Sequence, residues 1–173
     1  MNNIILIGFM GCGKTSVGKY LSRMQEYHFV DTDKWIEDKE KKTIPELFAS
    51  FGEAAFRQME TECIKELLTM KHQVSMVLSV GGGLVLKEEN RQLLKQLGTI
   101  IFLDASVDTL YERLKKDTSR PLLQGGNPKE RIITLLMERK AVYENCCDEV
   151  IQVDDKSFRE IADEILHCVK QDA

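Results

Sequence analysis

Short apolar runs alternate along the chain with longer segments in which apolar positions recur every three or four residues. The short runs predict buried strands, and the periodic segments predict helices that pack on them. Strands are expected at Asn3–Ile7, His28–Val30, Met76–Val80, Thr99–Leu103 and Glu149–Val153. Helices are expected at Lys14–Gln25, Lys34–Lys41, Ile44–Phe51, Glu53–Met70, Lys87–Leu97, Val107–Lys115, Pro128–Asn145 and Phe158–Lys170. This alternation predicts an α/β fold with a parallel sheet covered on both faces.

Three of the expected helix ends carry capping sequences. The run from Thr43 to Glu46 reads as a capping box with a proline in the first turn. Asn127 precedes a proline and is expected to cap the helix that follows it. Gly98 follows the last periodic residue of its helix and reads as a C′ glycine.

Length and composition indicate a single globular domain over residues 1–173. The chain is 43% hydrophobic and 30% charged, with no low-complexity tract or linker that divides it. The net charge of −4 argues against a nucleic-acid-binding surface, which needs a concentrated basic face. The negative net charge does not argue against an anionic substrate, because arginines at a binding site can make that site locally positive.

The cysteines and the N-terminal segment bear on location. The five cysteines are odd in number and match no zinc-binding spacing, so we expect reduced thiols in a cytoplasmic protein. The apolar run Ile4–Met10 is too short for a signal peptide or a membrane span. We therefore expect no membrane association, and a monomer, since no long apolar stripe requires a partner.

The segment from Gly8 to Thr15 matches the phosphate-binding P-loop pattern G-x-x-x-x-G-K-[ST] without a mismatch. Its glycines allow a tight turn whose N–H groups point inward, and the following helix adds a positive N-terminal end. Lys14 supplies a cation for the terminal phosphates, and Thr15 supplies a hydroxyl for Mg²⁺. An ordinary glycine turn would leave the Lys-Thr pair unexplained.

Two aspartates follow the second expected strand. Asp31 and Asp33 stand at the carboxyl end of that strand, where ligands bind in open α/β sheets. One can support a Mg²⁺ shell, and the other can accept a hydroxyl proton. Asp33 can also act as the N-cap of the helix expected from Lys34, and the two roles are compatible.

Two further features point to an acceptor site. Arg57 and Glu60 are three residues apart on a helix, which is also the spacing of an ordinary surface ion pair. Gly81, Gly82 and Gly83 end the third strand, although one glycine would suffice for a turn. Three glycines favour a ligand that must approach the backbone closely, such as a small polyhydroxylated molecule.

The segment 115–127 is polar and holds a proline and two adjacent glycines between two expected helices. It is either a plain surface loop or a lid that closes on a phosphoryl donor and excludes water. Arg113 and Arg120 flank it or lie in it, which suits neutralisation of a transferring phosphate. Asp104 fits a search for a second P-loop acid, but the aspartate pair already supplies acids, so we interpret it as a turn residue.

Taken in order, these motifs resemble the shikimate kinase family over essentially the whole chain. The resemblance rests on Gly8–Thr15, Asp31–Asp33, Phe56-Arg57 with Glu60, Gly81–Gly83, Arg120–Leu123 and Arg139 followed by Tyr143. It implies a three-layer α/β/α, P-loop nucleoside-monophosphate-kinase-like fold with a five-stranded parallel sheet in the order 2-3-1-4-5. It also implies a substrate-binding region at 31–62, a lid at 113–127, and transfer of the γ-phosphoryl group of ATP to the 3-hydroxyl of shikimate.

The resemblance assigns roles to individual residues. Nucleotide contacts fall to Gly11, Cys12, Gly13, Lys14, Thr15, Ser16, Arg113, Arg120 and Asp155, the last in the loop that covers the adenine opposite Arg113. Shikimate contacts fall to Asp33, Arg57, Gly81, Gly82, Gly83 and Arg139, with Phe48 and Phe56 as walls or as plain core residues. The expected catalytic residues are Lys14, Asp33 and Arg120. The expected Mg²⁺ ligands are Thr15, which binds directly, and Asp31, which binds through water.

The chemistry of shikimate suits these positions, because a planar arginine fork pairs well with its carboxylate. Whether Asp33 removes a proton or only orients the hydroxyl stays open at this point. Two alternatives stay open as well. One is another small-molecule kinase of this fold, such as a gluconate kinase-like enzyme, and the other is a non-catalytic nucleotide-binding module.

Overall fold

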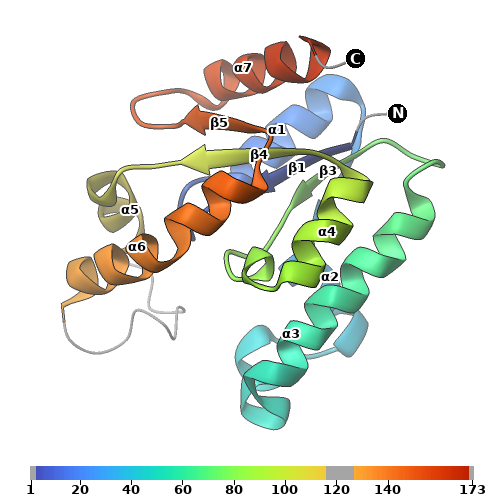
Figure 1. The fold of residues 1–173 in the computed structure, drawn as a ribbon, viewed down its shortest axis with the longest axis vertical. Helices are drawn as coiled ribbons and strands as arrows, with labels where there is room; N and C mark the ends of the chain where they lie inside the picture. The colour runs from blue at the N-terminus through green and yellow to red at the C-terminus, as the bar shows by residue number, and fades with distance from the viewer. Residues whose placement is uncertain (1–2, 116–126, 172–173) are drawn as a thin grey trace.

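The fold is built on a parallel five-stranded sheet in the order β2-β3-β1-β4-β5, in a computed structural model that describes residues 3–115 and 127–171 (Figure 1). The strands are β1 (Asn3–Ile7), β2 (His28–Asp31), β3 (Met76–Ser79), β4 (Gly98–Asp104) and β5 (Glu149–Gln152). This confirms the expected sheet order and the strand positions to within a residue or two.

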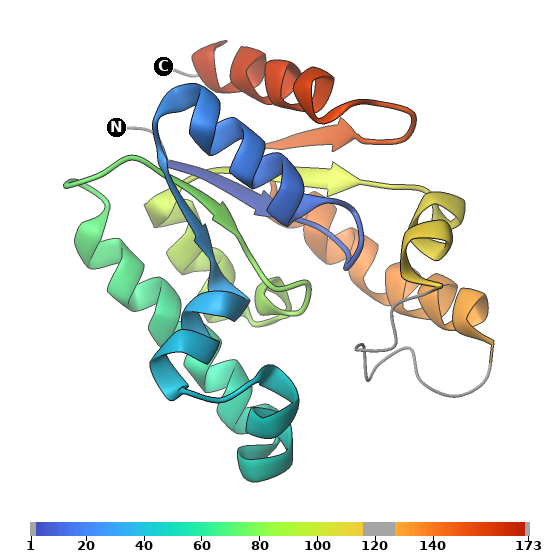
Figure 2. The same cartoon turned by 180° about the vertical axis from the view of Figure 1, so that it is seen from behind.

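Helices cover both faces of the sheet. On one face lie α1 (Lys14–Gln25) and α7 (Phe158–Gln171), and on the other lie α4 (Glu88–Leu97) and α6 (Pro128–Cys146), as the two opposite views show (Figures 1 and 2). The remaining helices are α2 (Thr32–Glu40), α3 (Ile44–Met70), α5 (Val107–Leu114) and the short 3₁₀ helix η1 (Leu84–Leu86). Every residue of β1 and β3 is buried, as expected for central parallel strands with covered faces.

The end of β2 differs from the sequence prediction in a way that matters for the site. The strand runs to Asp31, and α2 begins at Thr32 rather than at Lys34. Asp31 is the N-cap, because its Oδ1 accepts hydrogen bonds from the N–H groups of Asp33 (3.2 Å) and Lys34 (3.3 Å). The capping role considered for Asp33 is therefore wrong, and Asp33 lies in the first turn of α2.

Most of the predicted helix ends are confirmed. Glu46 accepts hydrogen bonds from the N–H and the hydroxyl of Thr43, both at 2.8 Å, and Asn127 caps α6 by accepting from the N–H of Lys129 at 3.1 Å. Gly52, at φ 79°, interrupts α3 between the two helices predicted there. Gly98 ends α4 for another reason than the one predicted: its backbone is extended, and a β-carbon there would lie 2.2 Å from the carbonyl oxygen of Asn3.

Two further findings concern the described ranges as a whole. All five cysteines are free thiols. Within residues 3–115 and 127–171, no helix has the length and apolar character needed to cross a membrane.

Candidate active site

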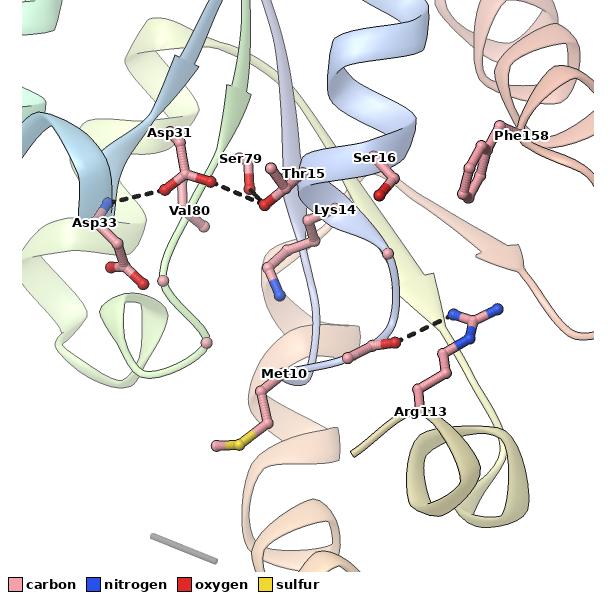
Figure 3. Close-up of a pocket in the computed structure, with 14 residues that line it drawn as sticks. Met10, Lys14, Thr15, Ser16, Asp31, Asp33, Ser79, Val80, Arg113 and Phe158 are labelled. Carbon is pink, nitrogen blue, oxygen red and sulfur yellow. Dashed lines mark hydrogen bonds between the residues drawn. The ribbon is translucent and has the colours of Figure 1, made fainter. Parts of the chain in front are cut away.

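A cavity of about 360 Å³ lies at the carboxyl ends of β1, β2 and β3 (Figure 3). This is the edge at which open parallel sheets bind ligands. It is lined by Met10, Gly11, Gly13, Lys14, Thr15, Ser16, Asp31, Asp33, Ser79, Val80, Gly81, Gly82, Arg113 and Phe158. The P-loop, both aspartates and two residues of the glycine turn therefore face one space.

The P-loop has the backbone that its glycines predict. Gly8, Gly11 and Gly13 have φ angles of 140°, 81° and 107°, a region that other residues rarely adopt. Space is also tight at Gly8, where a β-carbon would lie 2.6 Å from the carbonyl oxygen of Leu103. The Nζ of Lys14 folds over the loop and donates to the carbonyl oxygens of Gly8 (2.9 Å) and Phe9 (3.0 Å). The Lys14 ammonium group is thus held against the P-loop backbone, where it lines the cavity (Figure 3).

Three oxygen-bearing side chains meet at the base of the cavity. The Thr15 hydroxyl donates to Asp31 Oδ2 at 2.9 Å and lies 3.3 Å from the Ser79 hydroxyl. Neutral hydroxyls and carboxylates are the hard oxygen donors that Mg²⁺ prefers. Among the described residues, no three His, Cys, Asp or Glu side chains gather as a metal site. A metal here would therefore take most of its ligands from phosphate and water, which is the usual pattern for Mg²⁺ at nucleotides.

Asp33 lies across the cavity from Lys14, against the glycine turn (Figure 3). A β-carbon built on Gly81 would lie 2.6 Å from Asp33 Oδ1 and 3.2 Å from Glu60 Oε1. The Gly81 N–H donates to the buried Thr32 hydroxyl at 3.0 Å, which ties the turn to the start of α2. Gly81 is therefore a position where only glycine allows the carboxylate to approach the backbone so closely.

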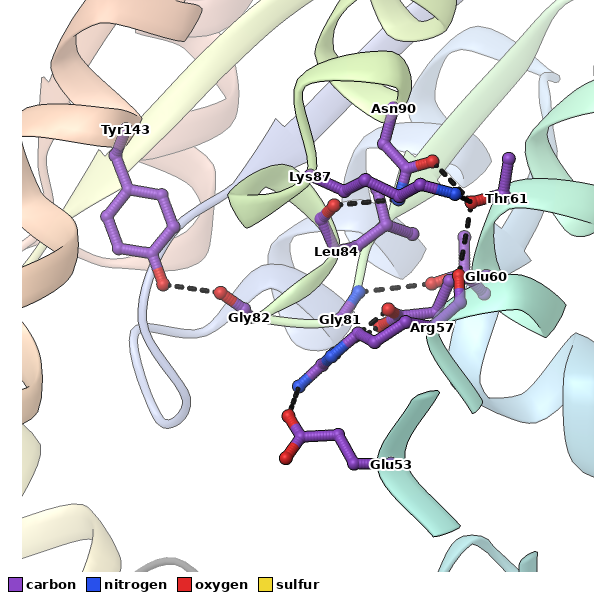
Figure 4. Close-up of polar contacts among 11 residues, drawn as sticks. Glu53, Arg57, Glu60, Thr61, Gly81, Gly82, Leu84, Lys87, Asn90 and Tyr143 are labelled. Atoms are coloured by element: carbon purple, nitrogen blue, oxygen red, sulfur yellow. Dashed lines mark hydrogen bonds and ion pairs between the residues drawn. The ribbon is translucent and has the colours of Figure 1, made fainter. Parts of the chain in front are cut away.

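Arg57 is not a surface ion-pair residue. Its Nη1 donates to both carboxylate oxygens of Glu60, at 3.0 and 2.8 Å, and its Nη2 to Glu53 at 3.0 Å (Figure 4). The side chain of Arg57 is 23% exposed and that of Glu60 is 1% exposed. A β-carbon on Gly83 would lie 2.7 Å from both Nη atoms, so the guanidinium packs flat on the turn. Glu60 and Glu53 each bind one Nη atom, and together they fix the orientation of this guanidinium.

Glu60 carries a carboxyl whose ionisation is strongly perturbed. Burial raises the pKa of Glu60 to about 7, and the charges of Asp33 and Glu53 act in the same direction. The guanidinium of Arg57 acts against this rise, but burial outweighs it. The sign of the effect on stability follows from the two states: the unfolded chain loses this proton near its ordinary value of 4.5, and the folded protein loses it near 7.

We therefore expect the contribution of Glu60 to the free energy of unfolding to fall as pH rises from about 4.5 to about 7. The full change is about 3 kcal/mol, since each pKa unit corresponds to about 1.4 kcal/mol. Urea unfolding at a series of pH values measures it. Glu60→Gln should flatten the decline in this window, whereas the exposed neighbour Glu62→Gln should keep it. An identical decline in Glu60→Gln would place the titrating group elsewhere.

The P-loop side of the cavity is completed by α5 and α7. Nη1 of Arg113 donates to the carbonyl oxygens of Gly11 and Cys12, both at 3.1 Å, so the side chain crosses from α5 to the P-loop. Phe158, the first residue of α7, lines the same cavity and keeps 47% of its surface exposed. The sequence analysis missed Phe158, although an aromatic residue placed directly after a polar loop was the available signal.

The structure brings together most, but not all, of the predicted site residues. Gly11, Gly13, Lys14, Thr15, Ser16, Asp31, Asp33, Gly81, Gly82 and Arg113 line the cavity. Cys12, Arg57, Gly83, Arg139 and Asp155 do not line it. Of these, Arg57 and Gly83 lie in contact beside it, Cys12 and Arg139 are buried, and Asp155 has φ 57° in the loop before α7. Arg120 and most of the lid predicted at 113–127 lie outside the described residues.

Comparison with known proteins identifies the family. The family model described as shikimate kinase matches residues 10–170. This chain belongs to the shikimate kinase family. The shikimate kinase of Thermodesulfovibrio yellowstonii is 46% identical over 166 residues, which cover 96% of this chain and 94% of that one. The shikimate kinase of Enterococcus faecalis is 42% identical and covers 99% of this chain and 100% of that one.

A solved structure of a shikimate kinase extends the comparison to the fold. The Acinetobacter baumannii enzyme, described as a complex with shikimate, matches with a TM-score of 0.92 and 35% identity over 99% of this chain and 94% of that one. Membership in the shikimate kinase family, the predicted fold and the kinase class are thereby confirmed. The roles of single residues rest on the geometry described above.

Proposed function

We propose that this shikimate kinase uses the cavity as a two-substrate site, with the donor on the P-loop and the acceptor on the glycine turn. The reaction is transfer of the γ-phosphoryl group of ATP to the 3-hydroxyl of shikimate. The single observation that supports this division is that Lys14 and Asp33 face one cavity from opposite sides. Phosphoryl transfer needs mainly such positioning and charge stabilisation.

On the donor side, the P-loop amides from Gly11 to Ser16 would hold the phosphates, and Lys14 would neutralise charge on the γ-phosphoryl group. Arg113 and Phe158 line the part of the cavity beyond the P-loop and would enclose the adenine, with Asp155 in the adjoining loop. Thr15 would hold Mg²⁺ directly, and Asp31 would hold it through water. When bound, the ion would screen the negative charge of the phosphates.

On the acceptor side, Arg57 and Arg139 would bind the shikimate carboxylate, and the backbone of Gly81–Gly83 would accommodate the ring. Asp33 would bind the 3-hydroxyl and act as its base or orient it. The substrate-binding region then covers 31–62, and the lid covers 113–127 with Arg120 as its charged residue. The close contact of Arg57 with Gly83 supports this placement of the carboxylate.

We further propose that the chain works as one domain and as a monomer in the cytoplasm, without nucleic-acid or membrane partners. The net charge of −4 and the five free thiols support this. Large exposed apolar residues of the described ranges are also spread over different elements, for example Met24 on α1, Phe51 on α3 and Met137 on α6.

Arg57→Lys tests the carboxylate site. Lysine keeps the charge but loses the planar fork, so it cannot pair with Glu60 and a carboxylate together. We expect kcat/KM for shikimate to fall by about 30- to 150-fold, which corresponds to about 2–3 kcal/mol, with KM for ATP within about twofold of wild type. Initial rates with each substrate varied in turn measure both constants.

The matched control is Arg159→Lys, because Arg159 is an exposed residue of α7 whose partner, Asp163, is exposed as well. That variant should retain wild-type kinetics. Unchanged shikimate kinetics in Arg57→Lys would show that Arg57 serves the helix and not the acceptor.

A further inference from the structure

The glycine turn has no side chains of its own, so its position depends on groups that bind its backbone. Two buried hydroxyls do so, and Figure 4 labels one of them, that of Tyr143. The Thr32 hydroxyl accepts from the Gly81 N–H at 3.0 Å, and the Tyr143 hydroxyl donates to the Gly82 carbonyl oxygen at 2.6 Å. Both side chains are fully buried. The turn is thus held between α2 on one side and α6 on the other.

The Tyr143 hydroxyl is not needed to fill space. Its ring packs on Phe102 of β4 with ring centroids 5.2 Å apart, a contact that phenylalanine would make equally well. Burying a hydroxyl carries a cost unless it is hydrogen-bonded. The presence of this group in the core therefore indicates that its bonds, and not its volume, matter at this position.

Tyr143 also lies beside Arg139, a proposed ligand of the acceptor carboxylate. The two residues are four apart on α6 and so lie on the same face of the helix. Arg139 is 8% exposed, and its positive charge acts against the rise in the pKa of Tyr143. Burial nevertheless raises the pKa of Tyr143 to about 12, so the hydroxyl keeps its proton and donates it to the Gly82 carbonyl oxygen at 2.6 Å.

The hydroxyl therefore ties the glycine turn to α6, a segment 61 positions further along the chain. Figure 4 shows Tyr143 on the side of the turn opposite to Arg57 and Glu60. Beneath the turn lies the P-loop, since a β-carbon on Gly82 would lie 3.4 Å from the Gly8 carbonyl oxygen and 3.5 Å from the Met10 nitrogen. The side chains of Lys14 and Arg113 bind carbonyl oxygens of the P-loop, whereas the glycine turn is bound by the hydroxyls of Thr32 and Tyr143.

We propose that Tyr143 is a positioning residue for the acceptor, whose hydroxyl fixes the glycine turn relative to α6, the helix that carries Arg139. This rests on the proposed placement of shikimate between Arg57, Arg139 and the turn. Tyr143 does not touch the substrate in this proposal. It acts by pre-orienting groups that do, so that shikimate does not have to order them on binding.

Tyr143→Phe removes only the hydroxyl. We expect KM for shikimate to rise about tenfold, kcat to change less than about threefold, and KM for ATP to stay within about twofold of wild type. Tyr27→Phe is the matched control, because Tyr27 lies between α1 and β2, outside the cavity. A folded Tyr143→Phe protein with unchanged shikimate KM would overturn the proposal, even if its melting temperature fell.

A double-mutant cycle with Arg139→Lys separates positioning from a general loss of packing. If Tyr143 acts through Arg139, the double variant should lose clearly less in kcat/KM for shikimate than the product of the two single losses. Losses that multiply fully would mean that the two side chains act independently, and would contradict the proposal.

Phe102→Leu provides a second route if Tyr143→Phe does not fold. This variant keeps the Tyr143 hydroxyl but loosens the packing of its ring. We expect KM for shikimate to rise less than in Tyr143→Phe, with KM for ATP again unchanged. An unchanged shikimate KM in that variant would count against the proposal. Wild-type turnover is measured first: absence of shikimate-dependent turnover there refutes the proposed function itself, whereas normal turnover leaves the role of Tyr143 to be decided by the variants.

Discussion

Replacing Lys14 by alanine is expected to lower kcat about 10³-fold, with either substrate saturating. The Nζ of Lys14 lies above the P-loop, within 3.0 Å of two backbone carbonyl oxygens, where it meets the cavity. Loss of one group that stabilises transition-state charge costs about 10²–10³-fold in rate, and Lys14 carries a full positive charge. Steady-state kinetics with ATP and shikimate both in excess measure the loss directly.

The control for this variant is Lys19→Ala. Lys19 belongs to the same helix, α1, but is exposed and lies over the Phe29 ring rather than over the P-loop. It should keep wild-type kcat. A kcat of Lys14→Ala within about threefold of wild type would mean that the phosphate site is misassigned.

Asp33→Asn is expected to lower kcat by about 10²–10⁴-fold, with little change in KM for ATP. The carboxylate of Asp33 lies against Gly81, on the side of the cavity proposed for the acceptor. The only other aspartate of the described residues that lines the cavity is Asp31, whose oxygens are bonded to Thr15 and to the start of α2. Asparagine keeps the shape but removes the charge. The measurement is kcat under saturation with both substrates.

Asp38→Asn is the comparison variant, because Asp38 lies on the same helix, is exposed and pairs with Lys34. Its kinetics should equal those of wild type. A kcat of Asp33→Asn between about a tenth and a half of the wild-type value would favour orientation of the hydroxyl over proton removal, since asparagine can still accept a hydrogen bond. A loss below about twofold would remove Asp33 from the reaction.

The predictions that held best depend on short-range physics. The strand and helix periodicities, the capping pair Thr43–Glu46 and the break at Gly52 are all decided within a few residues. The P-loop was predictable because its tight turn needs positive φ angles that glycine adopts readily, and the sequence has glycine at these positions. The sheet order came with the family resemblance, since spacing alone does not determine which strands are neighbours.

Two kinds of feature could not be predicted from the sequence: the choice between two residues equally suited to one role, and contacts between residues far apart in the chain. Asp31 and Asp33 are equally suited to cap α2, and the choice of Asp31 depends on where β2 ends in the sheet. The bond from Tyr143 to Gly82 joins residues 61 positions apart, and no local pattern indicates it. Phe158 lines the cavity because α7 packs beside α1, an arrangement that no local pattern indicates.

The most direct test of the account is acceptor-dependent release of ADP by the purified chain with Mg²⁺ and ATP. Shikimate and gluconate are offered separately at equal concentrations, and a reaction without acceptor gives the background. We expect ADP release that depends on shikimate and stays at background with gluconate. Turnover with gluconate but not shikimate, or ATP binding without release of ADP on addition of any acceptor, would contradict it.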